Sequence, residues 1–561
     1  MRAGYAALLA AVVALAIYSP SLMNGLAYDD VAIIALDPRV HEFDVREILT
    51  EGYWLDEGHA LYRPLTTLSF ALDWSLAPTQ PAWFHLVNTI LHAATAALVV
   101  LLLARFWTVA GAALGGLIFA VHPVHVEAVA NVVGRAELLA AVCFLAGCLV
   151  WLRRTPNGDG PADFGHASAG STLILPTAKA DRTAIDVSAA LRRIAVPLLF
   201  ALAVFSKESA IMLPAVLPLL DVATGELRRR TLRAYIARNV VAYALLAAVA
   251  LGYIVARAAV LGAAGGPQRL DPSVEVLDGT GARLLTALQA WPVFVRLLFA
   301  PVTLLADYGP RILGPAEVID ADVALGGLIL AAALAFGVVA LVRRHRRSAL
   351  ALLWFPVTIL PVSNLLFPIG VLVAERTLYL PSIALCFGAA ALPAYLRARV
   401  PRWRRVAAAA AVVIVVLFGV RSLVRIPEWE STDRIMLALV RDRPDAFRGH
   451  WHLARLARAQ GDDQAALERY AEAIELWPYR RRLVLEAIGF AARAQRMDYA
   501  ADLSAFAVHQ WPESVDAHRF LAATTLDRGD TAAAHRYLDA GLRLAPKDST
   551  MVRMRQAITG R

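Results

Sequence analysis

The sequence is poor in charged residues, in cysteine and in lysine. Only 18% of its 561 residues are charged, whereas 58% are hydrophobic, and the mean hydropathy is +0.55. This balance excludes an ordinary soluble globular protein, so we expect a lipid bilayer to form part of its solvent. The three cysteines, Cys143, Cys148 and Cys386, are too few for a disulfide framework and lie in apolar runs. We expect them to pack as small hydrophobic side chains.

Several familiar chemical motifs are also absent. The chain has no glycine-rich nucleotide-binding loop, no zinc-ligand spacing and no nucleophile elbow. From residue 427 onward it carries 20 basic and 19 acidic residues, so almost all of the net charge of +9 lies before that point. We expect this basic excess to reflect membrane topology, and it gives no support to nucleic-acid binding.

Long apolar runs are what the sequence has in abundance. A bilayer core requires about 20 apolar residues per helix. Candidate membrane segments occur at 4–20, 84–104, 107–126, 136–152, 194–206, 209–223, 239–260, 286–305, 323–342, 349–367, 372–396 and 406–424. The first segment resembles a signal peptide but precedes a whole membrane domain, so we interpret it as a retained helix.

Arginine clusters orient these segments through the positive-inside rule. The clusters are Arg153/Arg154 with Arg192/Arg193, Arg228–Arg230 with Arg233 and Arg238, Arg343/Arg344/Arg346/Arg347, and Arg397/Arg399/Arg402/Arg404/Arg405. The rule predicts a cytoplasmic N-terminus, with loop 21–82 and everything after residue 424 on the other side. Twelve crossings would misplace the third cluster. We therefore expect eleven crossings, with 286–305, interrupted by Pro292, Arg296 and Pro301, as the segment that does not cross.

Two further features complete the predicted topology. The stretch 155–190 is rich in Gly, Pro, Ala, Ser and Asp, which is typical of a flexible cytoplasmic loop. Abundant alanine and arginine with only three lysines favour a bacterium of high G+C content. The expected location is the bacterial inner membrane, with the C-terminal region in the periplasm.

Beyond residue 424 the pattern changes to a repeat. Four prolines, Pro444, Pro478, Pro512 and Pro546, recur every 34 residues, which is the tetratricopeptide period. Repeats are predicted at 447–480, 481–514 and 515–548. The sequence thus predicts an all-α protein in which a polytopic membrane domain, 1–426, precedes a tetratricopeptide-repeat solenoid, 427–561.

Polar residues gather near one predicted face of the membrane, opposite the arginine-rich loops. They are Asp29 and Asp30, His122, His125 and Glu127, Arg135 and Glu137, Lys207 and Glu208, Asp307, and Glu375 and Arg376 with Tyr379. Ionisable groups at this depth are costly and require partners or a function. A cluster of carboxylates and cations at a lipid boundary suits a reaction in which a lipid phosphate is the leaving group.

Each of these groups also has a structural interpretation. Asp29 and Asp30 could end a solvated helix, and the neighbouring acid–base pairs could be ion pairs that cap helices. The two histidines share a helix face, but Pro123 and the absence of a third ligand argue against a metal site. We therefore predict no protein-bound metal, and leave open a requirement for a divalent cation.

Several of these stretches resemble one known family, the transmembrane and tetratricopeptide-repeat O-mannosyltransferases, whose membrane domain has the GT-C glycosyltransferase fold. The similarity is carried by Tyr28-Asp29-Asp30 with Ala32-Ile33, Tyr62-Arg63-Pro64-Leu65, Phe84–Asn88 with His92, the long string His122–Leu139, Lys207-Glu208, Asp307-Tyr308 and Ala374–Ser382. It spans nearly the whole chain. The predicted array of about three repeats is shorter than is usual in the animal members.

The resemblance implies a membrane glycosyltransferase that moves a sugar, by analogy mannose, from a polyprenyl-phosphate donor to a Ser or Thr hydroxyl of an exported protein with inversion. It implies that Asp29 or Asp30 is the general base. Lipid-phosphate binding would fall to Arg63, Arg135, Lys207 and Arg376. Sugar-binding or structural roles would fall to His122, His125, Glu127, Glu137, Glu208, Asp307, Glu375 and Tyr379. The repeats would hold the acceptor polypeptide.

Two rival interpretations stay open from the sequence alone. The protein could be a non-catalytic, membrane-anchored repeat scaffold whose polar cluster only locks helices together. It could also be a GT-C enzyme that uses another sugar and a glycan or lipid acceptor. Convergence of the charged residues around one site would favour an enzyme over a scaffold.

Overall fold

The computed structural model describes residues 2–55, 61–153, 187–226, 232–262 and 279–560. Within these ranges the regular structure is entirely helical, so the predicted all-α class is confirmed. Most of the predicted loop 155–190 and part of the second arginine cluster lie outside the described residues. The last four residues of that loop instead belong to helix α9 (Val187–Ser206).

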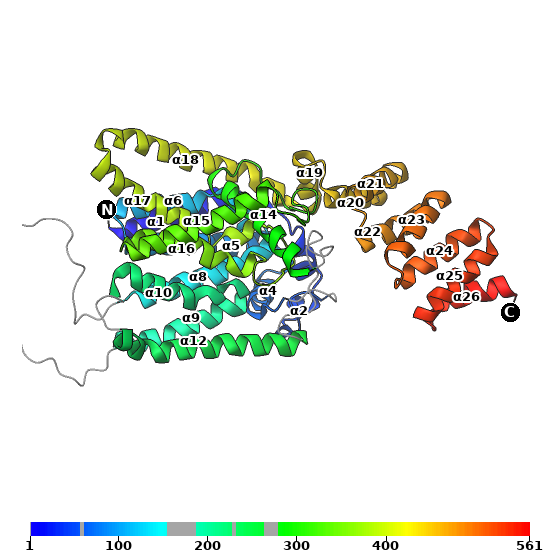
Figure 1. The fold of residues 1–561 in the computed structure, drawn as a ribbon, viewed down its shortest axis with the longest axis horizontal. Coiled ribbons are helices and arrows are strands. Elements are labelled where there is room, and N and C mark those ends of the chain that lie inside the picture. The colour runs from blue at the N-terminus through cyan, green and yellow to red at the C-terminus, as the bar shows by residue number, and fades with distance from the viewer. Residues whose placement is uncertain (1, 56–60, 154–186, 227–231, 263–278, 561) are drawn as a thin grey trace, which may run out of the picture.

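Long apolar helices make up the first part of the chain, running alongside one another (Figure 1). The longest are α1 (Ala3–Tyr18), α5 (Pro81–Leu103), α8 (Arg135–Trp151), α12 (Leu232–Leu261), α14 (Gly279–Phe299), α15 (Ala321–Val342) and α18 (Arg404–Arg425). With their immediate extensions, these seven are long and apolar enough to cross a membrane, and a bent pair, Val109–Val121 with Pro123–Ala130, would make eight among the described residues. The protein is therefore a multi-pass membrane protein.

Five shorter helical segments of the described ranges bear on the predicted eleven crossings. They are α6 (Val109–Val121), the apolar part of α9 (193–206), α10 (Leu213–Thr224), α16 (Arg346–Ile359) and α17 (Ile383–Arg399). Taken with the long helices other than α14 they would give eleven passes. On its own, each is shorter than a bilayer core requires. The count of eleven therefore stays a prediction.

Helix α14 is unbroken at Pro292, contrary to the interruption expected from the sequence. By length and composition α14 could cross the membrane. However, groups near both ends of the helix form hydrogen bonds with residues at the same end of the bundle. Arg283 donates to the carbonyl of Asn364 at 2.5 Å, and the Leu298 carbonyl is 3.0 Å from His122 Nε2. Asn364 follows a 3-10 turn, Leu360–Val362, that packs on the turn carrying Glu208. These contacts are compatible with the expectation that this segment does not cross, which stays a prediction.

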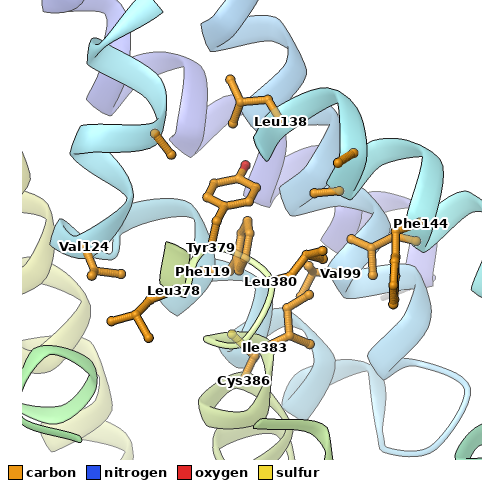
Figure 2. Packing of buried hydrophobic residues seen from close by; sticks show 14 of the residues in the cluster. Val99, Phe119, Val124, Leu138, Phe144, Leu378, Tyr379, Leu380, Ile383 and Cys386 are labelled. Atoms are coloured by element: carbon orange, nitrogen blue, oxygen red, sulfur yellow. The ribbon is translucent and has the colours of Figure 1, made fainter. Parts of the chain in front are cut away.

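Close packing in the bundle depends on small residues. On α6, Gly111 and Gly115 face α17 so closely that an added Cβ would lie 2.1 Å from the Ala390 carbonyl oxygen and 2.6 Å from that of Cys386. Small residues four apart allow such an approach between membrane helices. Figure 2 shows the neighbouring core, where the rings of Phe119 and Tyr379 meet edge to face at 5.2 Å.

Short helices in the first loop form a cap over one end of the bundle. They are α2 (Pro38–His41), α3 (Val45–Thr50) and α4 (Pro64–Leu76). Apolar side chains of this loop form a small core with Phe84 of α5 and with Val132 and Val133, which precede α8. We call this end of the bundle the site end; the N-terminus lies at the opposite end (Figure 1).

The C-terminal helices extend away from the site end (Figure 1). Helix α19 (Thr432–Asp442) packs into the core of the membrane domain through Ile435, Met436 and Leu439. Three helix pairs follow, α20 (Phe447–Ala459) with α21 (Asp463–Leu476), α22 (Arg481–Arg493) with α23 (Met497–Gln510), and α24 (Val515–Asp527) with α25 (Thr531–Leu544), before the final α26 (Ser549–Thr559). Each range predicted to be a repeat holds one pair.

Candidate functional site

The segment after α1 carries two adjacent aspartates with different surroundings. Asp30 is fully buried, and its carboxylate accepts the backbone N–H groups of Val133 at 2.8 Å and of Ala27 and Val132 at 3.2 Å. Burial raises the pKa of Asp30 to about 7, although these donors oppose the shift. The side chain fastens the loop to the start of α8. Its oxygens are committed to the backbone.

Asp29 instead faces a salt-bridge cluster. Its side chain is 21% exposed, and its Oδ2 lies 3.9 Å from Nη2 of Arg376. The same guanidinium forms an ion pair with Glu127, whose other oxygen accepts the backbone N–H of Arg376 at 2.9 Å. Glu127 is almost completely buried, so Arg376 joins a buried carboxylate to a partly exposed one. Of the two aspartates, Asp29 has the more accessible side chain.

Two more ion pairs complete this cluster. Arg63 makes a bidentate contact with Glu208, at 2.9 Å and 2.5 Å, and Lys207 forms an ion pair with Glu137. The charges of Asp29, Arg63 and Arg376 all act on the buried Tyr53 hydroxyl, and those of Asp29, Glu127 and Glu137 act on Arg376. Seven of the sequence-predicted charged residues therefore converge on one region: Asp29, Arg63, Glu127, Glu137, Lys207, Glu208 and Arg376. Arg63 and Arg376 are its more exposed cations, whereas Lys207 is nearly buried.

The electrostatic balance at Glu208 favours the carboxylate. Burial raises the pKa of Glu208, but the adjacent Arg63 guanidinium and Lys207 ammonium outweigh it, so the net pKa lies well below the ordinary value. Burial lowers the pKa of Lys207, opposed by Glu137. The cluster is thus a set of nearly balanced charges in a poorly hydrated place. A ligand phosphate would have to compete for cations that already have carboxylate partners.

Arg135 does not join this cluster, in contrast to the role expected from the sequence. Arg135 is completely buried and forms an ion pair with Asp73 of α4. Its guanidinium donates hydrogen bonds to Asn88 Oδ1 at 2.8 Å and to the Phe84 carbonyl at 3.0 Å. It also lies over the ring of Phe70. Its donors are used by protein groups on α4 and α5. The side chain holds the first loop against the bundle.

The histidines and Tyr379 bridge helices. His122 Nδ1 accepts the Val124 backbone N–H, so its Nε2 donates to the Leu298 carbonyl. His125 contacts the Phe119 carbonyl and Ser382 Oγ, each at 2.9 Å, and the Tyr379 hydroxyl lies 2.7 Å from Nδ1 of His92. All these groups are buried. In this arrangement their polar atoms serve contacts within the protein.

Glu375 and Asp307 make their contacts outside the cluster. Glu375 accepts the Leu305 backbone N–H and the Tyr308 hydroxyl on one carboxylate oxygen, while its other oxygen is buried without a hydrogen-bond partner among the described residues. Burial raises the pKa of Glu375 to about 7, with the Arg425 charge opposing. Asp307 lies 3.1 Å from Arg448 of α20, so it joins the membrane domain to the first repeat.

Two important residues were not singled out from the sequence. Asp73 neutralises Arg135, and Thr432 accepts a hydrogen bond from the loop that carries Asp29. Asp73 could have been noticed as an acidic residue inside the apolar stretch 64–76. The sequence gives no such signal for Thr432, because threonine is common at the start of a helix.

The described residues hold no group of three or more histidine, cysteine, aspartate or glutamate side chains arranged to bind a metal ion. The acidic groups of the cluster are engaged by arginine and lysine instead. A need for a metal ion therefore stays a matter for experiment.

Fold and site together define a class: a polytopic helical membrane protein with a charged cluster at one end of the bundle and a helical repeat array beyond it. Among known proteins, it is 28% identical over 68% of its length to Protein O-mannosyl-transferase TMTC3 of Mus musculus, and 27% identical over 88% to Protein O-mannosyl-transferase TMTC1 of Homo sapiens. It is 26% identical over 82% to Protein O-mannosyl-transferase F38B6.6 of Caenorhabditis elegans. The chain is a relative of these transmembrane and tetratricopeptide-repeat O-mannosyl-transferases.

These similarities have a defined extent. The matched regions cover 41%, 57% and 61% of the three relatives, so the chain spans about half of their length. No family model matches the chain. The resemblance found in the sequence is confirmed at the level of the family.

Proposed function

We propose that this protein is a membrane glycosyltransferase that moves mannose from a polyprenyl-phosphate donor to a Ser or Thr hydroxyl of a polypeptide. The observation that carries the proposal is the contact of Asp29 and Glu127 with the single guanidinium of Arg376, next to the Arg63–Glu208 and Lys207–Glu137 pairs. The names of the relatives supply the sugar and the class of acceptor. A scaffold gives no reason for this convergence.

The reaction is a single displacement. The acceptor hydroxyl oxygen attacks the anomeric carbon from the face opposite the phosphate, the bond from that carbon to the phosphate oxygen breaks, and the configuration inverts. Asp29 takes the hydroxyl proton, and the lipid phosphate leaves with the bonding electron pair. We assign the base to Asp29 because its carboxylate is partly exposed, whereas that of Asp30 is committed to three backbone N–H groups.

The leaving phosphate requires cations that can reach it. Arg376 and Arg63 are the partly exposed cations of the cluster, and we assign phosphate binding to them. The more buried Lys207 adds to the positive potential. Fixed cations in a poorly hydrated site stabilise growing negative charge more strongly than they would in water. Glu127 and Glu208 hold the two guanidinium groups in place before the donor arrives.

Location and acceptor complete the proposal. The arginine-rich loops would face the cytoplasm, so the site end and the repeats would lie in the periplasm of a bacterial inner membrane. The helix pairs α20–α25 would hold the acceptor polypeptide near the site end, where Arg448 of α20 pairs with Asp307 of the membrane domain.

The proposal is tested by an assay of mannose transfer with the purified full-length protein. Radiolabelled polyprenyl-phosphate mannose and Ser/Thr-containing peptides would be supplied, and the anomeric configuration of the product determined by NMR. Labelled peptide with inverted configuration supports the proposal. Label on a glycan or lipid would favour the alternative acceptor class, and retained configuration would contradict the single displacement.

A further inference from the structure

The loop that carries Asp29 is bonded to the segment that leads into the repeat array. We call residues 426–432, which run from the end of α18 to the first residue of α19, the junction. Asn24 Nδ2 donates to the Ile426 carbonyl at 3.0 Å, the Gly25 N–H donates to the Glu430 carbonyl at 3.0 Å, and the Tyr28 N–H donates to Thr432 Oγ1 at 2.8 Å. Segments about 400 residues apart in the chain are thereby joined beside the candidate base.

The last of these bonds occurs where the backbone is strained. Tyr28 has a φ of +57°, in the left-handed region that residues other than glycine rarely adopt. Such a conformation is unfavourable for a residue with a side chain and persists only where the surroundings hold it. The bond to Thr432 fixes the N–H of this residue, and Asp29 is the next residue along. The direction of the Asp29 side chain thus depends on a conformation that the junction maintains.

The junction itself is firmly placed. The Ser431 side chain caps α19 by accepting the Arg434 N–H, and α19 packs into the core of the membrane domain through Ile435 and Leu439. Thr432 is the first residue of this helix, so its hydroxyl is presented from a fixed element. Gly25 lies so close to the junction that an added Cβ would be 3.2 Å from the Glu430 carbonyl oxygen.

We infer that Thr432 is a positioning residue for transfer: its hydroxyl holds the Tyr28 backbone, and thereby places the Asp29 carboxylate for proton removal. The inference rests on the proposed function, because it takes Asp29 as the base. It assigns to the start of the array a role in the chemistry as well as in attachment. Misplacement of a reacting group by about 1 Å can cost about 100-fold in rate.

The experiment compares three variants of the full-length protein. Thr432→Val keeps the shape of the side chain but removes the acceptor, and Thr432→Ser restores it. Thr531→Val is the matched control, since Thr531 is also the first residue of a capped helix, α25, but lies in the third repeat. For each variant, kcat, the KM for the donor, and hydrogen exchange of a peptide covering residues 24–30 would be measured.

Thr432→Val should lower kcat about 10- to 100-fold, leave the donor KM within about twofold, and speed exchange at the Tyr28 amide at least about tenfold. Thr432→Ser and Thr531→Val should match the wild type. Normal kcat together with unchanged exchange in Thr432→Val would overturn the inference, as would a loss of kcat that serine does not rescue. A wild type without transfer activity would contradict the proposed function, and the exchange comparison would still decide whether Thr432 holds the loop.

Discussion

Glu127 accepts both the backbone N–H and the guanidinium of Arg376, and so joins two segments that lie about 250 residues apart in the chain. The first segment follows the bent end of α6, and the second begins the turn before α17. Because Asp29 approaches the same guanidinium, the contact ties three distant parts of the sequence to one cation.

Removing Arg376 should impair donor binding and turnover together, because its interaction with the phosphate begins in the ground state. Arg376→Ala alone would leave Glu127 buried without its partner, so the variant should be made with Glu127→Gln. We expect the donor Kd to rise at least about tenfold. Arg536→Ala, on the exposed face of α25, serves as the control and should bind donor normally. Unchanged donor affinity in the double variant would argue against the phosphate assignment.

Arg135 should matter for stability and not for donor affinity. Breaking its fully buried pair with Asp73 is expected to cost about 3–5 kcal/mol, so Arg135→Met should melt at a clearly lower temperature in detergent. The double variant Arg135→Met with Asp73→Asn should recover part of the loss, because no uncompensated charge remains. Protein that stays folded should bind donor with wild-type affinity. A loss of donor binding at unchanged melting temperature would contradict this prediction and support the role in lipid-phosphate binding that was expected from the sequence.

Glu375 should make stability depend on pH. Its pKa is raised from the ordinary 4.5 to about 7 by burial. Between these values the folded state binds the proton and the unfolded state does not, so this group's contribution is greatest below about pH 4.5 and is lost as pH rises through about 7. The melting temperature should therefore fall less between pH 5 and pH 8 in Glu375→Gln than in the wild type. Glu317→Gln, at an exposed position, should keep the wild-type slope.

Most of the fold could be predicted from the sequence, but the separate roles of neighbouring charged residues could not. Apolar runs and prolines 34 residues apart locate helices because burial and helix packing act on local pattern. Asp29 and Asp30 are indistinguishable in sequence, since their difference lies in which one meets the backbone N–H groups of Val132 and Val133. Arg135 looked like a phosphate ligand because its partner, Asp73, lies 62 residues away and no pattern links them.

Topology offers an independent check. The arginine-rich loops predict that the site end and the repeats face the periplasm. A reporter fused at residue 561 that works only after export should be active, and one inserted after Arg344 should be inactive. Activity of the export-dependent reporter inserted after Arg344 would contradict the predicted orientation. Activity of a reporter that works only in the cytoplasm, fused at residue 561, would contradict it too. Either result would also contradict the proposal that the donor is used on the periplasmic side.

The central claim is that Asp29 is the base for transfer from a lipid-linked mannose, and the most direct measurement is the turnover of Asp29→Asn. Asparagine keeps the shape but cannot take the proton, so turnover should fall about 10²- to 10⁴-fold while donor affinity and melting temperature stay near wild type. Asp30→Asn should instead lower the melting temperature, because its carboxylate holds three backbone N–H groups. Full transfer activity in correctly inserted Asp29→Asn protein would contradict the account.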